Sequence, residues 1–293
     1  MFNHQTAASN AFQQVLSTNQ ELLLNQVISE FDAYVQKLRD HGIDVIVIED
    51  TPEPVKPDAV FPNNWATFHH NGRIILYPMC APNRRLERRP EIIEQLKQHF
   101  IVNEVTDLSF NEHQGIYLEG TGSIIFDHNA KMAYACISDR TNEGLLGEIC
   151  AELGYEKHVF HAKDKNGKDI YHTNVMMCIG DGFCVACTEC IADSSERENF
   201  KSSIGGAGLE LVEISMHQVE KFAGNMLQLK NKQGEKYLVM SQTAFNSLTS
   251  NQITTLNAST QLLPVNVSTI ECIGGGSARC MISEIFLPPI TSK

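Results

Sequence analysis

Apolar and polar positions follow two different periods along the chain. Between residues 21 and 41 the apolar positions recur at helical spacing and Gly42 supplies a stop signal, which predicts a helix with one buried face. The apolar positions of this helix are Leu24, Val27, Ile28, Phe31, Val35 and Leu38. The β-branched run at 43–50 then predicts a strand, and its continuous apolar character is typical of burial on both faces.

From residue 64 onward one pattern occurs four times: two strands joined by a turn, then a helix, then a third strand. The turns fall at HHNG (69–72), DHNA (127–130), GDG (180–182) and KQGE (232–235). The predicted helices occupy 90–100, 142–153, 195–208 and 245–259, and the third strands occupy 101–108, 155–162, 209–215 and 262–270. A fifth unit is expected to begin with a strand at Cys280.

Each unit is expected to open its first strand with a polar or reactive residue. These anchors are Asn64, Glu119, His172, Asn225 and Cys280, spaced 53 to 55 residues apart. Repeats of this kind stack or close because one unit cannot bury its own apolar face. We therefore predict one α/β domain over residues 1–293, a five-bladed α/β propeller of ββαβ units with pseudo-fivefold symmetry. The period by itself is also compatible with a solenoid.

In a closed ring the five anchors lie at equivalent depth and form a pocket of thiol, imidazole, carboxylate and amides. Three glycines at 274–276 favour presentation of Cys280 at a turn, although most single cysteines are small buried hydrophobes. His172 fits a general acid or base, or a strand-edge histidine. Glu119 fits an orienting carboxylate, or a solvated one. Asn174 lies two residues after His172 and therefore shares its face of a strand.

Charge and composition exclude several classes of partner. The 23 Lys and Arg against 35 Asp and Glu give a net charge of -12, which repels nucleic acid and anionic membranes. No apolar run reaches the roughly 18 residues that a spanning helix needs, and the N-terminus has no leader pattern. Nine cysteines suit reduced thiols in the cytoplasm. Cys184, Cys187 and Cys190 have the spacing of a metal site, but their strand-rich surroundings favour structural cysteines.

Seven ordered segments resemble the signatures of the guanidine-modifying superfamily, which includes arginine deiminases, amidinotransferases and dimethylarginine dimethylaminohydrolases. The segments are PDAVFPNNW (57–65), APNRRLER (81–88), LEGTGSIIF (118–126), SDRTNEG (138–144), YHTN (171–174), AGNMLQL (223–229) and GGGSARCM (274–281). The chain is most similar to the arginine deiminase-related group that contains citrulline-utilisation hydrolases. The resemblance implies the five-bladed pentein fold and an enzyme that needs no metal or cofactor.

The resemblance also implies roles for individual residues. Cys280 is the implied nucleophile, His172 the general acid and base, and Glu119 the carboxylate that pairs with the imidazole or a substrate nitrogen. Asp58 is implied to hold an α-amino group, while Arg85 and Arg140 hold an α-carboxylate, since guanidinium groups match carboxylates in two-point contacts. Asn64, Asn174 and Asn225 complete the expected substrate contacts.

Two of these positions depart from the family pattern. Members that act on arginine commonly carry aspartates where Asn64 and Asn174 stand, and a neutral amide suits a ureido group better than a guanidinium. We therefore expect hydrolysis of a small ureido amino acid, citrulline, to ornithine, ammonia and carbon dioxide. The alternatives are arginine deimination, dialkylamine release, amidino transfer, and a catalytically silent propeller used for binding or assembly.

The first strand of the family is expected to be missing before the segment that begins at Asn3. The last blade then lacks a pairing strand and exposes an edge beside the nucleophile. A misassigned start, a truncated chain or a partner subunit each account for this. A homodimer is the default expectation for a soluble enzyme.

Overall fold

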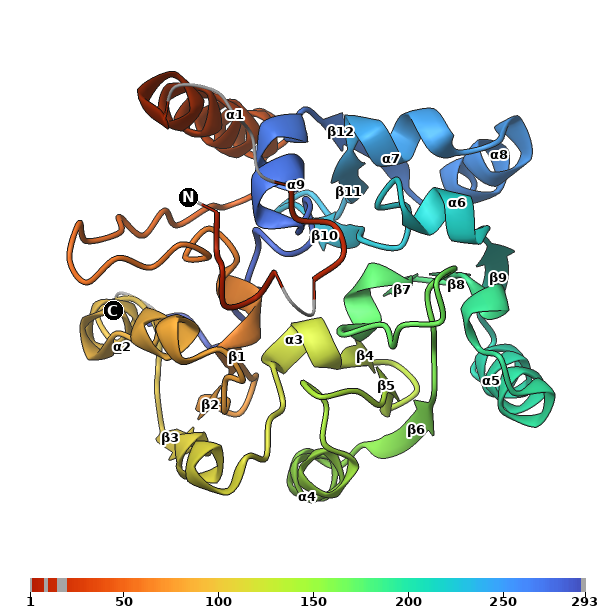
Figure 1. Cartoon of the computed structure of the whole chain (residues 1–293), viewed down its shortest axis with the longest axis horizontal. Helices are drawn as coiled ribbons and strands as arrows, with labels where there is room; N and C mark the ends of the chain where they lie inside the picture. Colours follow the sequence, from red (N-terminus) through yellow and green to blue (C-terminus); the bar gives the residue numbers. More distant parts are fainter. Residues whose placement is uncertain (1, 8–9, 15–19, 291–293) are drawn as a thin grey trace.

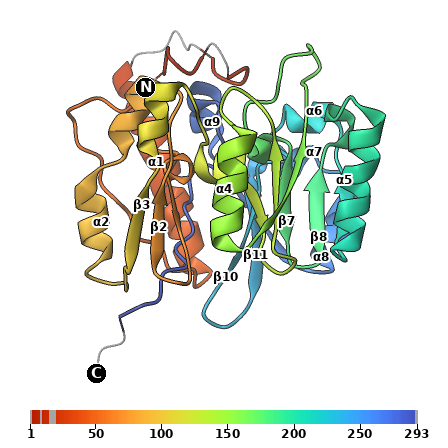
Figure 2. The same cartoon turned by 90° about the horizontal axis from the view of Figure 1, so that it is seen from below.

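The computed structural model describes residues 2–7, 10–14 and 20–290. The two ends of the expected domain, residues 1 and 291–293, lie outside the described residues, as do 8–9 and 15–19. Within the described part, the strands form four three-stranded sheets in a mixed α/β fold. In Figures 1 and 2 these sheets stand side by side around a common centre, with α2, α4 and α5 on the outside.

The four sheets share one topology, in which the second strand pairs antiparallel with the first and parallel with the third. The first two sheets contain β1 (Ala66–Phe68), β2 (Arg73–Leu76) and β3 (Glu104–Asp107), then β4 (Ile125–Asp127), β5 (Met132–Cys136) and β6 (Glu156–Phe160). The other two contain β7 (Met177–Gly180), β8 (Phe183–Ala186) and β9 (Glu210–Glu213), then β10 (Leu227–Lys230), β11 (Lys236–Ser241) and β12 (Gln261–Val265). The repeat predicted from residue 64 onward is therefore confirmed in four units.

Each parallel connection passes through helix, as a crossover between parallel strands requires. The crossover helices are α2 (Pro90–Leu96), α4 (Glu143–Leu153), α5 (Ser194–Gly206) and the pair α7 (Gln242–Ser247) and α8 (Ser250–Asn257). The remaining helices are α1 (Gln20–Asp40), α3 (Gly120–Ser123), α6 (Met216–Val219) and α9 (Ser268–Gly274). Short 3₁₀ turns are η1 (Pro62–Asn64), η2 (Pro82–Glu87), η3 (Ser109–Gln114), η4 (Thr173–Val175) and η5 (Thr188–Cys190).

The fifth unit differs from the prediction. Neither 43–50 nor the segment that follows Cys280 is a strand, and the latter contributes only isolated bridges such as Phe68 with Ile285. In each of the other four units a middle strand is hydrogen-bonded to the strands on both sides, whereas no described segment has this position in the fifth unit. The helix predicted at 21–41 is confirmed as α1, and it packs against α9.

Two predicted elements between residues 245 and 270 also have different bounds in the structure. The strand predicted at 262–270 ends at Val265, and α9 begins at Ser268. The buried Glu30 carboxylate of α1 accepts the backbone N–H groups of Thr269 and Ile270, which stabilises a helix start there. The helix predicted at 245–259 is split, because Thr249 caps a new helix, α8.

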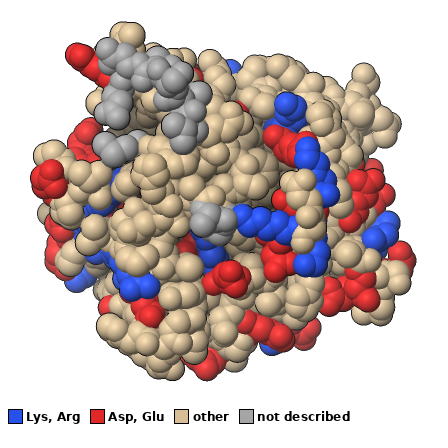
Figure 3. Space-filling model, viewed as in Figure 1, with Lys and Arg blue, Asp and Glu red and all other residues tan. Residues whose placement is uncertain are grey.

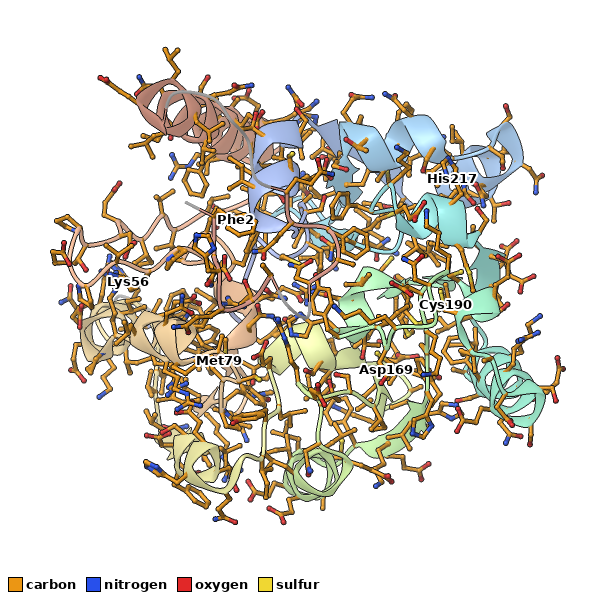
Figure 4. The ribbon with its side chains drawn as sticks, in the orientation of Figure 1. Phe2, Lys56, Met79, Asp169, Cys190 and His217 are labelled. Atoms are coloured by element: carbon orange, nitrogen blue, oxygen red, sulfur yellow. The ribbon has the colours of Figure 1, made fainter. Side chains whose placement is uncertain are left out.

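The interior is built mainly from the inner strands and the crossover helices. Cys184, Cys187 and Cys190 are buried in the largest apolar cluster, among side chains of β7, β8 and α5. Figure 4 marks Cys190 inside the fold on the side of β9 and α5. On the face seen in Figure 3, basic and acidic side chains are intermixed and neither sign covers the surface.

Candidate active site

Four of the five anchors lie in the connections that precede the inner strands, not at the first residues of those strands, and the fifth, Cys280, precedes no described strand. Asn64 ends η1, Glu119 precedes α3, His172 precedes η4, and Asn225 lies two residues before β10. Cys280 lies in a turn after α9, six residues beyond Gly274. The expected strand positions are thus wrong by two to six residues, but the anchors are brought to one end of the sheets.

The Cys280 thiol faces two neutral amides. Its Sγ lies 3.2 Å from Asn225 Nδ2 and 3.4 Å from Asn174 Nδ2, and its residue is 7% exposed. Asn225 Nδ2 also lies 2.9 Å from the Asn174 carbonyl oxygen, which fixes the two amides relative to one another. Both amides therefore present N–H groups to the sulfur.

His172 and Glu119 form a second buried pair. His172 Nε2 lies 2.7 Å from Glu119 Oε2, and Arg140 Nη1 lies 3.6 Å from the same oxygen. The other Glu119 oxygen accepts the backbone N–H of Cys80 at 2.9 Å. Burial alone would raise the pKa of Glu119, but Arg140 and His172 hold it well below its usual range. Burial lowers the pKa of His172 to about 4, against the opposing effect of Glu119.

Close backbone approach holds this group of residues together. A Cβ on Gly122 would lie 2.3 Å from Asn64 Nδ2 and 2.9 Å from the ring of His172. Only glycine fits at such distances. Gly122 lies in α3 and lets Asn64 and His172 approach one another.

Arg84 is a second buried residue that the sequence analysis missed. Its guanidinium bonds to both carboxylate oxygens of Glu87, donates to Asn64 Oδ1 at 2.6 Å, and lies 3.7 Å from Asp58. Burial raises the pKa of Glu87 to about 7, with Arg84 opposing this effect. The sequence signal for Arg84 was the pair of adjacent arginines in APNRRLER, of which Arg85 was predicted to be the substrate contact.

Arg85, the next residue of η2, contacts a different set of groups. It donates to the Met79 carbonyl at 3.0 Å and forms an ion pair with Glu112 at 3.2 Å. Arg88 shares the same carboxylate at 2.7 Å. Figure 4 marks Met79, which follows β2 in the chain.

The N-terminal segment lies over the same end of the fold. Asn3 donates to Asp58 Oδ2 at 2.7 Å, and Thr6 donates to the same oxygen at 3.2 Å. Asn10 donates to the carbonyls of Gly274 and Gly275, just before the turn that carries Cys280. In Figures 1 and 2 the segment crosses the end of the ring at which α3 and α9 lie, and Figure 4 marks Phe2 there.

Several buried polar atoms of this region have no hydrogen-bond partner within the described residues. They are Asp58 Oδ1, Asn64 Nδ2, Asn174 Oδ1 and Asn225 Oδ1. Unpaired buried polar atoms cost about 1–3 kcal/mol each, so their concentration beside one thiol indicates a site prepared for a polar ligand.

Comparison with known proteins identifies the family of this chain. The family model for eukaryotic N,N dimethylarginine dimethylhydrolase matches residues 1–287. The chain belongs to this family. It is therefore a carbon–nitrogen hydrolase of the guanidine-modifying superfamily, as its sequence motifs predicted. No curated protein matches the chain.

Solved structures of low sequence identity share the fold. The N-terminal domain of ArgZ, an arginine dihydrolase of the cyanobacterial ornithine–ammonia cycle, was solved as a cysteine-to-serine variant bound to substrate. It aligns with a TM-score of 0.73 at 16% identity, over 95% of this chain and 94% of that one. A dimethylarginine dimethylaminohydrolase adduct aligns with a TM-score of 0.63 at 17% identity, over 88% and 90%.

Some of these relatives are much longer than this chain. AgrE in complex with ornithine and NAD+ aligns with a TM-score of 0.70 at 18% identity, over 90% of this chain but only 35% of its own. Full-length ArgZ is covered to 38%. Among the described residues, no helix is both long and apolar enough to cross a bilayer.

Proposed function

We propose that the protein hydrolyses the ureido group of citrulline through a covalent intermediate on Cys280. The observation that carries this proposal is the pair of neutral amides, Asn174 and Asn225, that contact the thiol. Each amide also has a carbonyl oxygen without a partner. A ureido group carries both N–H donors and a carbonyl acceptor, so amides match it without the charge that a guanidinium needs.

The proposed reaction begins with attack of the Cys280 sulfur on the ureido carbon. The thiol proton passes to His172, which donates it to the departing nitrogen and leaves an S-carbamoyl thioester on Cys280. His172 then removes a proton from the water that attacks this thioester, which frees the thiol and a carbamate. The carbamate decomposes to carbon dioxide and the second nitrogen product. The low pKa of His172 suits removal of the proton from water, since the imidazole is neutral near pH 7. Glu119 orients the imidazole through its bond to Nε2. Citrulline and one water yield ornithine, ammonia and carbon dioxide, so the atoms balance.

The remaining contacts belong to the amino-acid end of the substrate. Asp58 takes the α-ammonium in place of Asn3 and Thr6, whose N–H and O–H groups occupy that oxygen in this structure. Arg85 and Arg140 take the α-carboxylate. Asn64 is the other proposed contact of the substrate, and its Oδ1 accepts a hydrogen bond from Arg84.

The fifth unit, the cellular location and the assembly are part of the same proposal. The segment after Cys280 and residues 43–50 act as the outer members of a fifth blade, which completes a five-bladed ring in one domain. The nine cysteines suit the reducing cytoplasm, and a homodimer is the default assembly.

A product screen tests the proposed substrate. Purified protein is incubated separately with citrulline, arginine, agmatine and methylated arginines, and ornithine, ammonia and amines are measured. Release of ornithine from citrulline with little turnover of arginine supports the proposal. Preferential turnover of arginine or methylated arginine would show instead the activity named by its family and by ArgZ.

The nucleophile is tested in parallel with Cys280→Ala. We expect a loss of turnover with an unchanged melting temperature, and loss of the mass adduct formed with iodoacetamide at this position. Cys272→Ala is the matched control, because Cys272 is a partly exposed thiol outside the site. Turnover near the wild-type rate in Cys280→Ala, or absence of turnover from the wild type on all substrates, would favour a silent binding protein.

A further inference from the structure

A cavity of about 290 Å³ lies among the inner strands. Its lining includes Phe68, Asp127 and Gly180, which end β1, β4 and β7, and Gln228, the second residue of β10. The lining also includes the residue that precedes Cys280 in the chain, but not Cys280 itself.

One wall of this cavity is aromatic. The rings of Phe126 and His128 are stacked with centroids 5.8 Å apart, and Phe286 lies edge-on to His128 at 4.9 Å. His69 lies edge-on to Phe126 at 6.5 Å. Such a wall contacts hydrocarbon and attracts a cation through the ring faces.

The charged groups around the cavity are paired, with one exception. Arg279 lies 3.5 Å from Glu284, and Asp181 is bonded to Lys236. Asp127 is 3% exposed, and its Oδ1 accepts two backbone N–H groups of the following turn. Its Oδ2 is buried without a partner.

The two imidazoles of the aromatic wall do not balance this charge. Burial lowers the pKa of both His69 and His128 to about 4, so both rings are neutral near pH 7. Lys131 lies over the ring of Tyr155 and forms no ion pair with Asp127. The cavity therefore presents one uncompensated carboxylate oxygen next to an aromatic surface.

We propose that this cavity binds a small organic amine, whose ammonium group bonds to Asp127 Oδ2 and whose hydrocarbon part lies on the aromatic wall. A metal ion fits less well, since no group of three His, Cys, Asp or Glu side chains within the described residues is arranged to hold one. The buried Nε2 of Gln228 also has no partner and offers a donor to an oxygen of the amine's substituent. A volume of 290 Å³ accommodates a compact ligand of a few carbon atoms.

Calorimetric titration of the intact chain with n-butylamine tests the site, with n-butanol as the uncharged probe of similar shape. We expect a dissociation constant of about 1 mM or tighter for the amine and at least tenfold weaker binding of the alcohol. Asp127→Asn keeps the Oδ1 acceptor of the turn and removes the charge, so it should weaken amine binding at least tenfold with an unchanged fold by circular dichroism.

Two variants at residues that do not line this cavity are the matched controls. Asp58→Asn removes the carboxylate expected to hold a substrate ammonium, and Cys280→Ala removes the thiol, but neither residue lines this cavity. Both should bind n-butylamine as the wild type does. The proposal is refuted if Asp127→Asn retains wild-type affinity, if either control abolishes binding, or if the wild type binds no amine or binds the alcohol equally well. None of these outcomes depends on which substrate Cys280 acts upon.

Discussion

Asn174→Asp is the substitution that most directly tests why the site would prefer a neutral substrate. It replaces the Nδ2 donor 3.4 Å from the Cys280 sulfur with a carboxylate oxygen of nearly the same size. Asn174 is fully buried, so the new charge has little access to solvent. The variant should turn over citrulline less efficiently and arginine more efficiently.

The expected magnitude follows from two opposite effects. A carboxylate and a guanidinium about 4 Å apart attract by about 4 kcal/mol at an effective dielectric of about 20. Burial of the new charge takes back about half of this, which leaves about 2 kcal/mol in favour of arginine. Loss of the donor costs citrulline about 1–2 kcal/mol. The ratio of kcat/KM for citrulline over arginine should therefore fall by about 100-fold to 1000-fold, at about 1.4 kcal/mol for each factor of ten.

The assay measures kcat/KM for each substrate from initial rates of product release. Asn111→Asp is the matched control, since Asn111 is also buried and donates to a backbone carbonyl, but lies in η3 outside the site. It should lower the melting temperature without changing the substrate ratio. A ratio that changes by less than about threefold in Asn174→Asp would refute the role of amide neutrality.

Three other outcomes follow from the geometry. Gly122→Ala should lower kcat/KM at least tenfold because the new Cβ would collide with Asn64 and His172. The control Gly205→Ala on α5 places a Cβ with nothing within 4 Å and should leave activity unchanged. Equal activities of the two variants would contradict the close approach at Gly122. Since burial lowers the pKa of His172 to about 4, a limb of the pH–rate profile that requires neutral imidazole should fall below about pH 5, and histidine NMR titration measures that pKa directly; a midpoint near 6.5 would count against this environment. Glu30→Gln should cost about 1–2 kcal/mol in urea unfolding because Glu30 accepts backbone N–H groups at the start of α9. The exposed Glu148→Gln on α4 should cost almost nothing, and similar losses in both would remove that explanation.

The repeated units were predictable because their signals are local. Turn residues at HHNG and KQGE, flanked by apolar strands, identify β1–β2 and β10–β11 without knowledge of the tertiary structure. The start of α9 was not predictable in this way. The carboxylate that accepts its first N–H groups belongs to Glu30, more than 230 residues earlier in the chain.

The candidate site shows the same division. Cys280, His172 and Glu119 could be named from motif and period, and the last two do form a hydrogen bond. Choosing between Arg84 and Arg85 required knowledge of which side of η2 faces the interior, because adjacent residues of a short turn point in different directions. The contact of Asn3 with Asp58 joins segments 55 residues apart that share no pattern.

The charges around the thiol support a substrate with a neutral side chain. Arg84 is bonded to Glu87, and Arg140 lies beside Glu119, so these two cations are matched within the site. Asp58 lies 3.7 Å from Arg84 and keeps one carboxylate oxygen without a partner. One carboxylate is therefore left for one ammonium group.

An excess of positive charge also lies at Arg85 and Arg88. Arg85 and Arg88 share the single carboxylate of Glu112, which leaves one cation in excess for an α-carboxylate. An α-amino acid carries one ammonium and one carboxylate on the same carbon, and so brings one charge of each sign to the site. A neutral ureido tail leaves the balance intact, whereas a guanidinium would bring an additional positive charge to Asn174 and Asn225, neither of which carries the charge to pair with it. This balance is the physical reason to expect citrulline ahead of arginine, and it is the balance that Asn174→Asp would reverse.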